Sequence, residues 1–278
     1  MPAVRAARQQ PVAESCMGYH HATMAELFTS IYFVAALFFI VALVYSSVGL
    51  GGGSSYTALM VILGFSASVI PTVSLLLNLL VTTIGSFNFI RNRHARFDLV
   101  VPFLVTSVPM SYLGGALQLP EQVFQWVLLV SLLVVALRIY FWRDTAIRLE
   151  LGTTGRVAVS LLAGAVLGLI AGMVGIGGGV YLVPLILILG LGTEQEAAAC
   201  GAVFVWLNSL AGLLSRMEYN SINLVDYIPL IMAVVLGGAL GSWMGAFRLS
   251  RKTMEKILGV IVVVAIILLV RSIRQAAL

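Results

Sequence analysis

The glycine-rich stretch V-G-L-G-G-G at residues 48–53 decides how this sequence is interpreted, because it returns as V-G-I-G-G-G at 174–179. The two copies start 126 positions apart in a chain of 278 residues, and each lies within apolar sequence. A glycine in the interior of a helix costs about 1 kcal/mol relative to alanine. Such dense glycine therefore predicts an interrupted helix at an equivalent place in each half of the chain.

The composition around these stretches is that of a membrane protein. The chain is 60% hydrophobic and 10% charged, whereas an ordinary soluble domain is about 25% charged. No Asp, Glu, Lys, Arg or His occurs between Leu27 and Ile90. Since a helix needs about 20 apolar residues to cross a bilayer, this run holds two crossings. The segment 27–48 is too long for a signal-peptide core, so we expect it to be a retained helix.

The net charge of +5 does not indicate nucleic-acid binding, because the basic residues gather in short loops between apolar segments. Lys and Arg are retained in this way on the cytoplasmic side of membrane proteins. The two cysteines, Cys16 and Cys200, are too few for a disulfide framework or a cysteine metal site. We expect no metal, no cofactor and no nucleic-acid partner.

Apolar segments of two lengths follow one another along the chain. The eight long segments are approximately 27–48, 68–90, 98–117, 122–142, 156–174, 196–216, 224–246 and 254–271. Two short ones, 54–65 and 180–191, directly follow the glycine stretches. A helix of 12 residues reaches only ~18 Å, which is less than the ~30 Å hydrocarbon core. The short segments are therefore expected to be half-helices.

The two halves share further motifs in the same order. I-L-G occurs at 62–64 and 188–190, Leu-Asn at 77–78 and 207–208, and G-G-A-L at 114–117 and 237–240. This order predicts a duplication. The expected fold is an all-α integral membrane protein with two repeats, each of four long transmembrane helices and one short half-helix. The expected divisions are a polar segment at 1–26, a first repeat at 27–143, a basic loop at 144–155, a second repeat at 156–273 and a tail at 274–278.

Two topologies remain open at this point. If each short segment completes a crossing, each half has five passes and the repeats are inverted. If the short segments re-enter without crossing, each half has four passes and the repeats are parallel. The distribution of basic residues slightly favours inversion once Arg5 and Arg8, which lie far from the first helix, are set aside. Inverted repeats also suit a binding site at the middle of the membrane.

The glycine stretches are the first candidates for a binding site. A new helix start offers free amides and the positive end of a helix dipole, which together favour an anion. Nearby hydroxyl groups and the paired asparagines would add neutral polar contacts. The alternative is that the glycines only allow close helix packing and that the asparagines only join helices. The candidate substrate-binding residues are Gly51, Gly52, Gly53, Ser54, Ser55, Tyr56, Asn78, Gly177, Gly178, Gly179, Tyr181 and Asn208.

Charged residues argue against other chemistries. Asp98, Asp226, Arg138 and Arg216 lie near segment ends, where solvated or interfacial placement is expected. A carboxylate cation site and a buried proton relay are therefore not supported. No H-E-x-x-H motif accompanies the histidines, and no His–acid pair at membrane depth could activate a serine. We expect that the chain is not an enzyme and has no catalytic residues.

The duplicated motifs resemble those of the sulfite exporter TauE/SafE permease family. They are the V-G-L-G-G-G at the end of the first helix, G-M-V-G-I-G-G-G at 172–179, Y-L-V-P-L at 181–185 and the two G-G-A-L motifs. The resemblance covers residues 27–273. The second half has Val180 where the first has Ser54, so hydroxyl contacts to an anion are expected to differ between the halves.

The resemblance implies a multi-pass permease of the bacterial inner membrane that moves small sulfur oxyanions such as sulfite or sulfonates. We expect alternating access between the two repeats, with the glycine breaks as hinges. The expected partners are a small anionic substrate, the lipid bilayer and a second copy of the chain in a homodimer. A non-transporting membrane scaffold or assembly factor, or an anion channel, remains an alternative.

Overall fold

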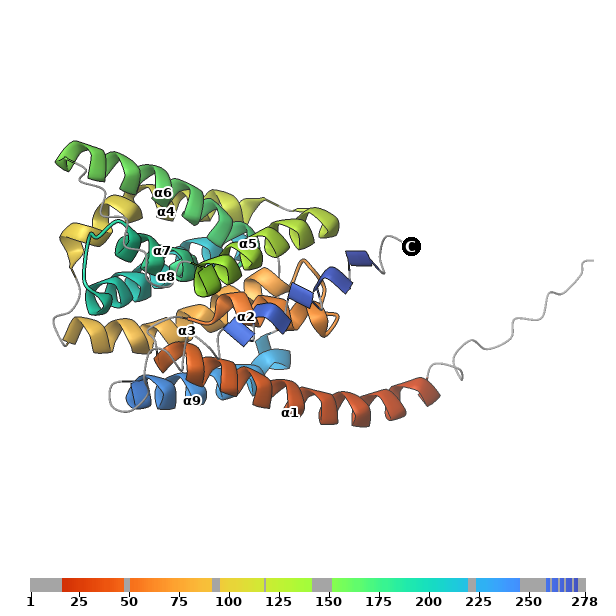
Figure 1. Ribbon diagram of the computed structural model, residues 1–278. Coiled ribbons are helices and arrows are strands. Elements are labelled where there is room, and N and C mark those ends of the chain that lie inside the picture. The colour runs from red at the N-terminus through yellow and green to blue at the C-terminus, as the bar shows by residue number, and fades with distance from the viewer. Residues whose placement is uncertain are drawn as a thin grey trace, which may run out of the picture.

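A computed structural model describes residues 17–47, 51–91, 96–117, 119–141, 152–219, 224–245 and short stretches between 259 and 274. Every regular element within these ranges is helical, which confirms the expected all-α class (Figure 1). The first-half helices are α1 (Met17–Ser47), α2 (Gly53–Ile62), α3 (Ile70–Arg91), α4 (Phe97–Ala116) and α5 (Glu121–Phe141). They are followed by α6 (Thr153–Val174), α7 (Gly179–Ile188), α8 (Glu194–Met217), the 3₁₀ turn η1 (Leu224–Tyr227) and α9 (Ile228–Gly245).

Five of the described helices are long and apolar enough to cross a membrane, and they lie within α3, α4, α6, α8 and the η1–α9 segment. The two helices that follow the glycine stretches, α2 and α7, have only 10 residues each. The chain is thus a multi-pass membrane protein, and the predicted alternation of long and short helices is confirmed. Residues 48–50, which belong to the first glycine stretch, lie outside the described residues, as do most of the predicted basic loop and both ends of the chain.

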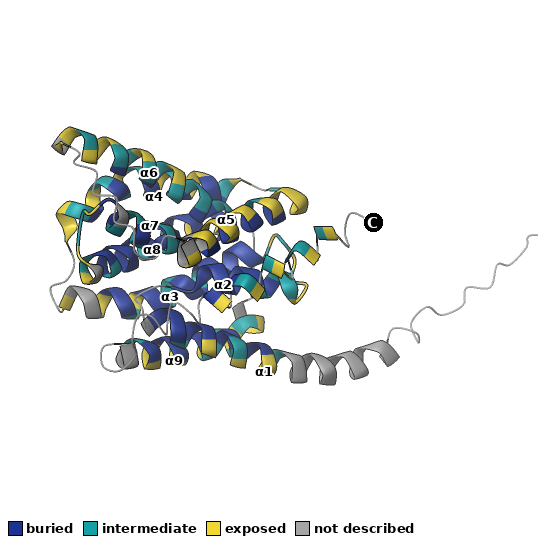
Figure 2. Ribbon diagram, viewed as in Figure 1, coloured by how far each residue is buried: buried dark blue, intermediate teal, exposed yellow. Residues whose placement is uncertain are grey.

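Burial separates central helices from peripheral ones. Figure 2 shows that α2, α3 and α8 are mostly buried, whereas the outward faces of α4, α5 and α6 are exposed. The exposed positions on these outer helices are apolar, for example Val105, Trp126 and Leu162. Such faces are suited to lipid, which solvates apolar side chains as well as a protein interior does.

The two halves interlock through pairs of closely packed helices. The α1–α9 pair lies along one edge of the bundle, and the α4–α6 pair lies along the opposite edge (Figure 1). On α6, the space for a Cβ at Gly168 is occupied by the backbone of Ser107 on α4. On α9, the space at Gly241 is occupied by the backbone of Leu43 on α1. Small residues let membrane helices approach in this way, so each half contributes one helix to each edge.

The repeated motifs adopt the same local structure in both halves. The I-L-G copies end α2 and α7, with Gly64 (φ 77°) and Gly190 (φ 62°) in the left-handed conformation. The amide of Phe65 donates to the carbonyl of Met60 at 2.9 Å, and the amide of Leu191 donates to that of Ile186 at 3.0 Å. Both ends are Schellman caps. The two G-G-A-L copies also correspond, because Gly114 packs on the α6 backbone and Gly237 on the α1 backbone.

Candidate functional site

Two equivalent breaks in the helices form the centre of the molecule. Gly52 (φ 89°) precedes α2 and Gly178 (φ 80°) precedes α7, and both adopt the left-handed conformation that disfavours every residue with a Cβ. The carbonyl of Gly52 accepts hydrogen bonds from the amides of Ser55 and Tyr56, at 3.1 and 3.0 Å. The carbonyl of Gly178 accepts the amides three and four residues later in the same pattern, at 3.1 and 3.2 Å. The amides that open each helix have no acceptor within it, as at any helix N-terminus.

The two breaks meet at Asn78 of α3. The Nδ2 group of Asn78 donates to the carbonyl of Gly175 at 3.3 Å, and the hydroxyl of Ser74, one turn earlier, donates to the same carbonyl at 2.8 Å. The Asn78 side chain also fills the space where a Cβ at Gly51 or Gly53 would stand. A first-half helix therefore contacts both breaks at once.

This meeting point leaves no room for larger residues. A Cβ at Gly53 would lie 2.6 Å from the carbonyl oxygen of Ile176, which belongs to the other break. The Ser74 hydroxyl also lies 3.3 Å from the carbonyl of Gly53 and accepts a hydrogen bond from Thr57 at 2.9 Å. The predicted glycines thus bring backbone from both halves into direct contact, and this contact requires glycine on the first-half side.

The predicted hydroxyl groups of the first half are engaged with α1. The phenol of Tyr45 lies 3.0 Å from the hydroxyl of Ser54 and 2.8 Å from that of Ser55. The ring of Tyr56 is fully buried and stacks on Phe38 at 5.2 Å between centroids. The sequence did not indicate Tyr45, because a tyrosine in an apolar helix carries no signal of what it contacts.

The second half is arranged differently around its asparagine. The Nδ2 group of Asn208 donates to the hydroxyl of Ser107 on α4 at 3.0 Å and to the carbonyl of Phe204 at 2.8 Å. Its backbone carbonyl accepts the hydroxyl of Ser111 at 2.8 Å. Asn208 thus joins α8 to α4, while Ser209, its neighbour, lies 3.0 Å from the Cβ position of Gly177. Tyr181 is on the first turn of α7, packed against the main hydrophobic core.

Several buried polar atoms near the breaks have no hydrogen-bond partner. They are the phenol oxygen of Tyr56, the amide oxygens of Asn78 and Asn208, and the hydroxyl of Ser209. A buried polar group without a partner costs about 1–3 kcal/mol. Native proteins keep such groups where a ligand or water completes them. Their presence at this place supports a polar ligand.

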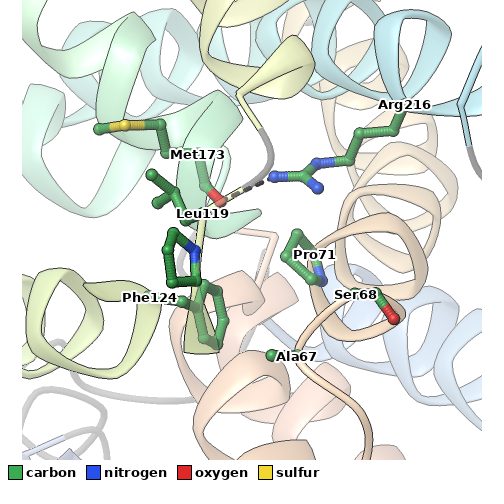
Figure 3. A pocket seen from close by; sticks show the side chains of 8 residues that line it. Ala67, Ser68, Pro71, Leu119, Phe124, Met173 and Arg216 are labelled. Atoms are coloured by element: carbon green, nitrogen blue, oxygen red, sulfur yellow. Dashed lines mark hydrogen bonds between the residues drawn. The ribbon is translucent and has the colours of Figure 1, made fainter. Parts of the chain in front are cut away.

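Arg216 overturns the expectation that the charged residues near segment ends are solvated. It lies in the last turn of α8 and is only 6% exposed. Its Nη2 group donates to the carbonyls of Gly172 at 3.0 Å and Met173 at 2.8 Å, which end α6 just before the second break (Figure 3). The position of Arg216 near a segment end suggested that it lies at the membrane interface, but the end of α8 packs inside the bundle. No sequence signal distinguishes these two environments.

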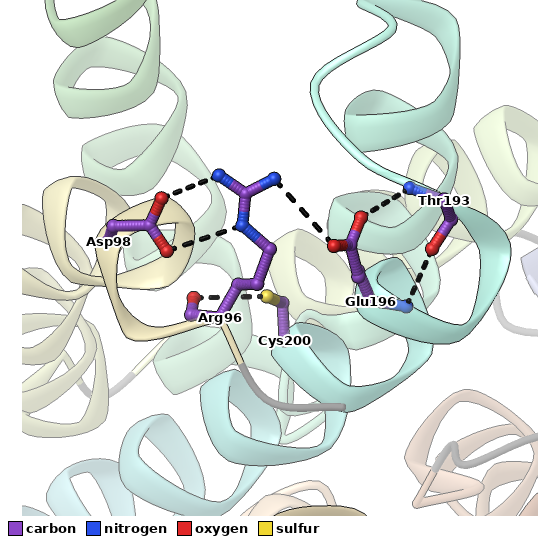
Figure 4. Close-up of polar contacts among 5 residues, drawn as sticks. All are labelled: Arg96, Asp98, Thr193, Glu196 and Cys200. Atoms are coloured by element: carbon purple, nitrogen blue, oxygen red, sulfur yellow. Dashed lines mark hydrogen bonds and ion pairs between the residues drawn. The ribbon is translucent and has the colours of Figure 1, made fainter. Parts of the chain in front are cut away.

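Charged residues also gather near the opposite end of α8, where Asp98 is exposed as expected. Arg96, which precedes α4, pairs with exposed Asp98 at 2.6 Å and with Glu196 at 3.7 Å (Figure 4). Glu196 also completes a capping box with Thr193 at the start of α8. The sulfur of Cys200, which is buried, donates to the carbonyl of Arg96. This cluster joins the first half to the second at one face of the membrane.

Comparison with known proteins agrees with this architecture. The family model described as sulfite exporter TauE/SafE matches residues 34–270. The chain belongs to this family. It is 36% identical over 236 residues to the probable membrane transporter protein y4hK of Sinorhizobium fredii, a match that covers 84% of this chain and 95% of the relative.

Two Bacillus subtilis proteins of the same description are more distant. The chain is 23% identical to probable membrane transporter protein YjnA over 232 residues, covering 78% of this chain and 91% of the relative. It is 28% identical to probable membrane transporter protein YunE over 114 residues, covering 41% and 40%. No solved structure matches the chain significantly. The matched family and these relatives identify a transporter family, and the family match extends across both glycine breaks.

Proposed function

We propose that this protein is a secondary transporter for small sulfur oxyanions such as sulfite or sulfonates, with the anion held where the two glycine breaks meet. The observation that carries this proposal is the contact of Asn78 with both breaks. The positive ends of two helix dipoles converge there, and each contributes amides without intrahelical acceptors. The unpartnered hydroxyl groups of Tyr56 and Ser209 near the breaks would donate hydrogen bonds to such an anion.

Neutral donors suit transport better than a buried cation would. The residues that meet at the breaks are glycine, serine, threonine and asparagine. Amides and hydroxyls offer weaker bonds than the bidentate pair of an arginine with an oxyanion. An anion held in this way can leave again, which a transporter requires.

The course of the helices supports inverted repeats. Ser68 and Pro71, at the start of α3, line the same pocket as Arg216 at the end of α8, so these equivalent helices run antiparallel. The first helices of the two halves also enter the bundle from opposite sides (Figure 1). Equivalent helices that run in opposite directions are the mark of repeats related by an axis in the membrane plane.

In alternating access, the site would open in turn to the two ends of the bundle, and these ends differ. At one end of α8 the Arg96–Glu196 pair joins the halves, and at the other a pocket opens beside Arg216. Rocking one repeat against the other would separate the ion pair and close the pocket, with the breaks as hinges. We also propose that the protein lies in the bacterial inner membrane, because membership of the sulfite exporter TauE/SafE family implies this location.

The test is anion exchange by purified protein in liposomes. Vesicles loaded with unlabelled sulfite should accumulate labelled sulfite in a saturable manner, and a panel of sulfonates should compete. Ohmic conductance without saturation would indicate a channel instead. Vesicles that exchange none of these anions would contradict transport and favour a scaffold.

A further inference from the structure

A pocket outside the glycine breaks lies where four helices begin or end. It has a volume of about 350 Å³ and is lined by residues at the ends of α6 and α8 and at the starts of α3 and α5 (Figure 3). The guanidinium of Arg216 projects into it, opposite Pro71 and Leu119. No residue of this pocket was among the candidates that the sequence suggested.

Arg216 is the only charged residue among the described residues that line the pocket. Among the described residues, the ion pairs within 4.0 Å involve Arg96 rather than Arg216. The Nε group of Arg216 is buried and has no hydrogen-bond partner. The two backbone carbonyls that the Nη2 group of Arg216 contacts carry only partial charges. A buried cation without a counter-ion is costly, and an anion in the pocket would relieve this cost.

Apart from Ser68, the other described side chains of the lining are apolar, and the pocket is larger than an inorganic ion needs. Phe124, Met173, Leu119 and Pro71 supply the surface around the guanidinium. Among the described lining residues, only Ser68 carries a hydroxyl group, and this group lies 2.8 Å from the hydroxyl of Ser66. A volume of this size is at the lower end of the range for organic ligands, and apolar walls with one charged group are typical of such sites.

We propose that this pocket binds a small organic anion, with its oxyanion head at Arg216 and a short apolar tail along Phe124 and Met173. This proposal rests on the proposed function in one respect, because the pocket would admit the transported anion before the anion reaches the glycine breaks. The head group would compete with the carbonyls of Gly172 and Met173 for the guanidinium. Binding in the pocket therefore acts on the end of α6, directly before the second break.

Calorimetric titration of the purified full-length protein in non-ionic detergent tests this proposal. The probes are sulfate, methanesulfonate and butanesulfonate. Affinity should rise about three- to fourfold for each methylene that the walls cover, and sulfate should bind most weakly. Arg216→Gln should weaken butanesulfonate binding about tenfold or more, because it removes a charge-assisted hydrogen bond. Arg91→Gln, at an exposed arginine at the end of α3, should leave it unchanged.

A second variant keeps the test decisive if Arg216→Gln does not fold. Ala67→Leu fills part of the pocket without touching the charge, and it should weaken butanesulfonate more than methanesulfonate. Equal affinity in wild type and Arg216→Gln, or equal affinity for all three probes, would overturn the proposal. Loss of butanesulfonate binding on adding phosphatidylglycerol would also overturn it, by showing that the pocket is a lipid site.

The outcomes separate this pocket from the proposed transport site. If the wild type binds butanesulfonate through Arg216 but exchanges no anion in liposomes, transport is contradicted and the pocket stands. If liposomes exchange sulfite while Arg216→Gln keeps full affinity, the pocket is contradicted and transport stands.

Discussion

Asn78 is the residue on which the two halves converge. Its amide nitrogen contacts the carbonyl of Gly175, and its side chain fills the space over Gly51 and Gly53. The equivalent residue, Asn208, instead joins α8 to Ser107 on α4. Two asparagines at matching positions in the repeat thus have different surroundings, and their substitution should have different effects.

Asn78→Asp should remove sulfite binding, and it should also lower Tm without sulfite because a carboxylate replaces the donor to the Gly175 carbonyl. The new carboxylate has the shape of the amide but carries its own negative charge at the helix N-termini, where the dipoles stabilise it by about 0.3–1 kcal/mol. It would act as a built-in anion and repel the substrate. Measured by thermal unfolding, the variant should lose the sulfite-dependent rise in Tm that the wild type shows.

Asn208→Asp is the matched comparison. It replaces a donor to the Phe204 carbonyl by a carboxylate, so it should lower Tm without sulfite by an amount equivalent to about 1–3 kcal/mol. A sulfite response that survives intact in Asn78→Asp would count against the proposed site.

The sequence predicted the residues of the breaks better than their contacts. Dense glycine is a local signal, and the helix starts at Gly53 and Gly179 follow from it. That Tyr45 engages the hydroxyls of Ser54 and Ser55 depends on how α1 packs. The burial of Arg216 depends on how α8 packs against α6. Its position in the sequence therefore predicted a solvated or interfacial environment, which is wrong.

At the scale of elements, glycine has two separate roles. The glycines of the breaks turn the chain and bring two backbones together. Those of α6 and α9 have ordinary helical conformation and only allow close packing on α4 and α1. The repeat of G-G-A-L belongs to this second role. The sequence could not separate the two roles, because both leave the same residue in the same apolar context.

Gly168→Ala should destabilise the α4–α6 pair. The added methyl group would overlap the backbone of Ser107, which cannot move aside as a side chain can. Overpacking of this kind costs about 1–3 kcal/mol. Gly85→Ala is the control, because nothing lies within 4 Å of its Cβ position in α3, and removal of a helical glycine should raise stability by about 0.5–1 kcal/mol. Unfolding in denaturant should therefore shift in opposite directions for the two variants.

At the scale of the whole molecule, the sequence predicted the long and short helices because length and hydropathy are local properties. It left the topology open because charge counts in loops were nearly balanced. The antiparallel course of α3 and α8 depends on contacts across the bundle, such as the shared pocket of Pro71 and Arg216. The proposed inversion of the repeats is therefore argued from these tertiary contacts.

Labelling of single cysteines in intact cells should test the inversion. In a background with Cys16 and Cys200 replaced by alanine, Ser66→Cys and Met217→Cys should react from the same side of the membrane, and Arg91→Cys from the other. These positions are exposed and lie at the ends of α3 and α8. Parallel repeats would place Ser66 and Met217 on opposite sides, as seen with a membrane-impermeant maleimide.

We propose that the contact between the two breaks forms the anion site of a transporter. Counterflow of labelled sulfite in liposomes, measured for the wild type, Gly85→Ala and Gly53→Ala, tests it most directly. Gly53→Ala places a methyl group 2.6 Å from the carbonyl of Ile176 in the other break, whereas Gly85→Ala meets nothing. We predict saturable exchange by the wild type and Gly85→Ala, and none by Gly53→Ala. Exchange by Gly53→Ala at the wild-type rate would contradict it.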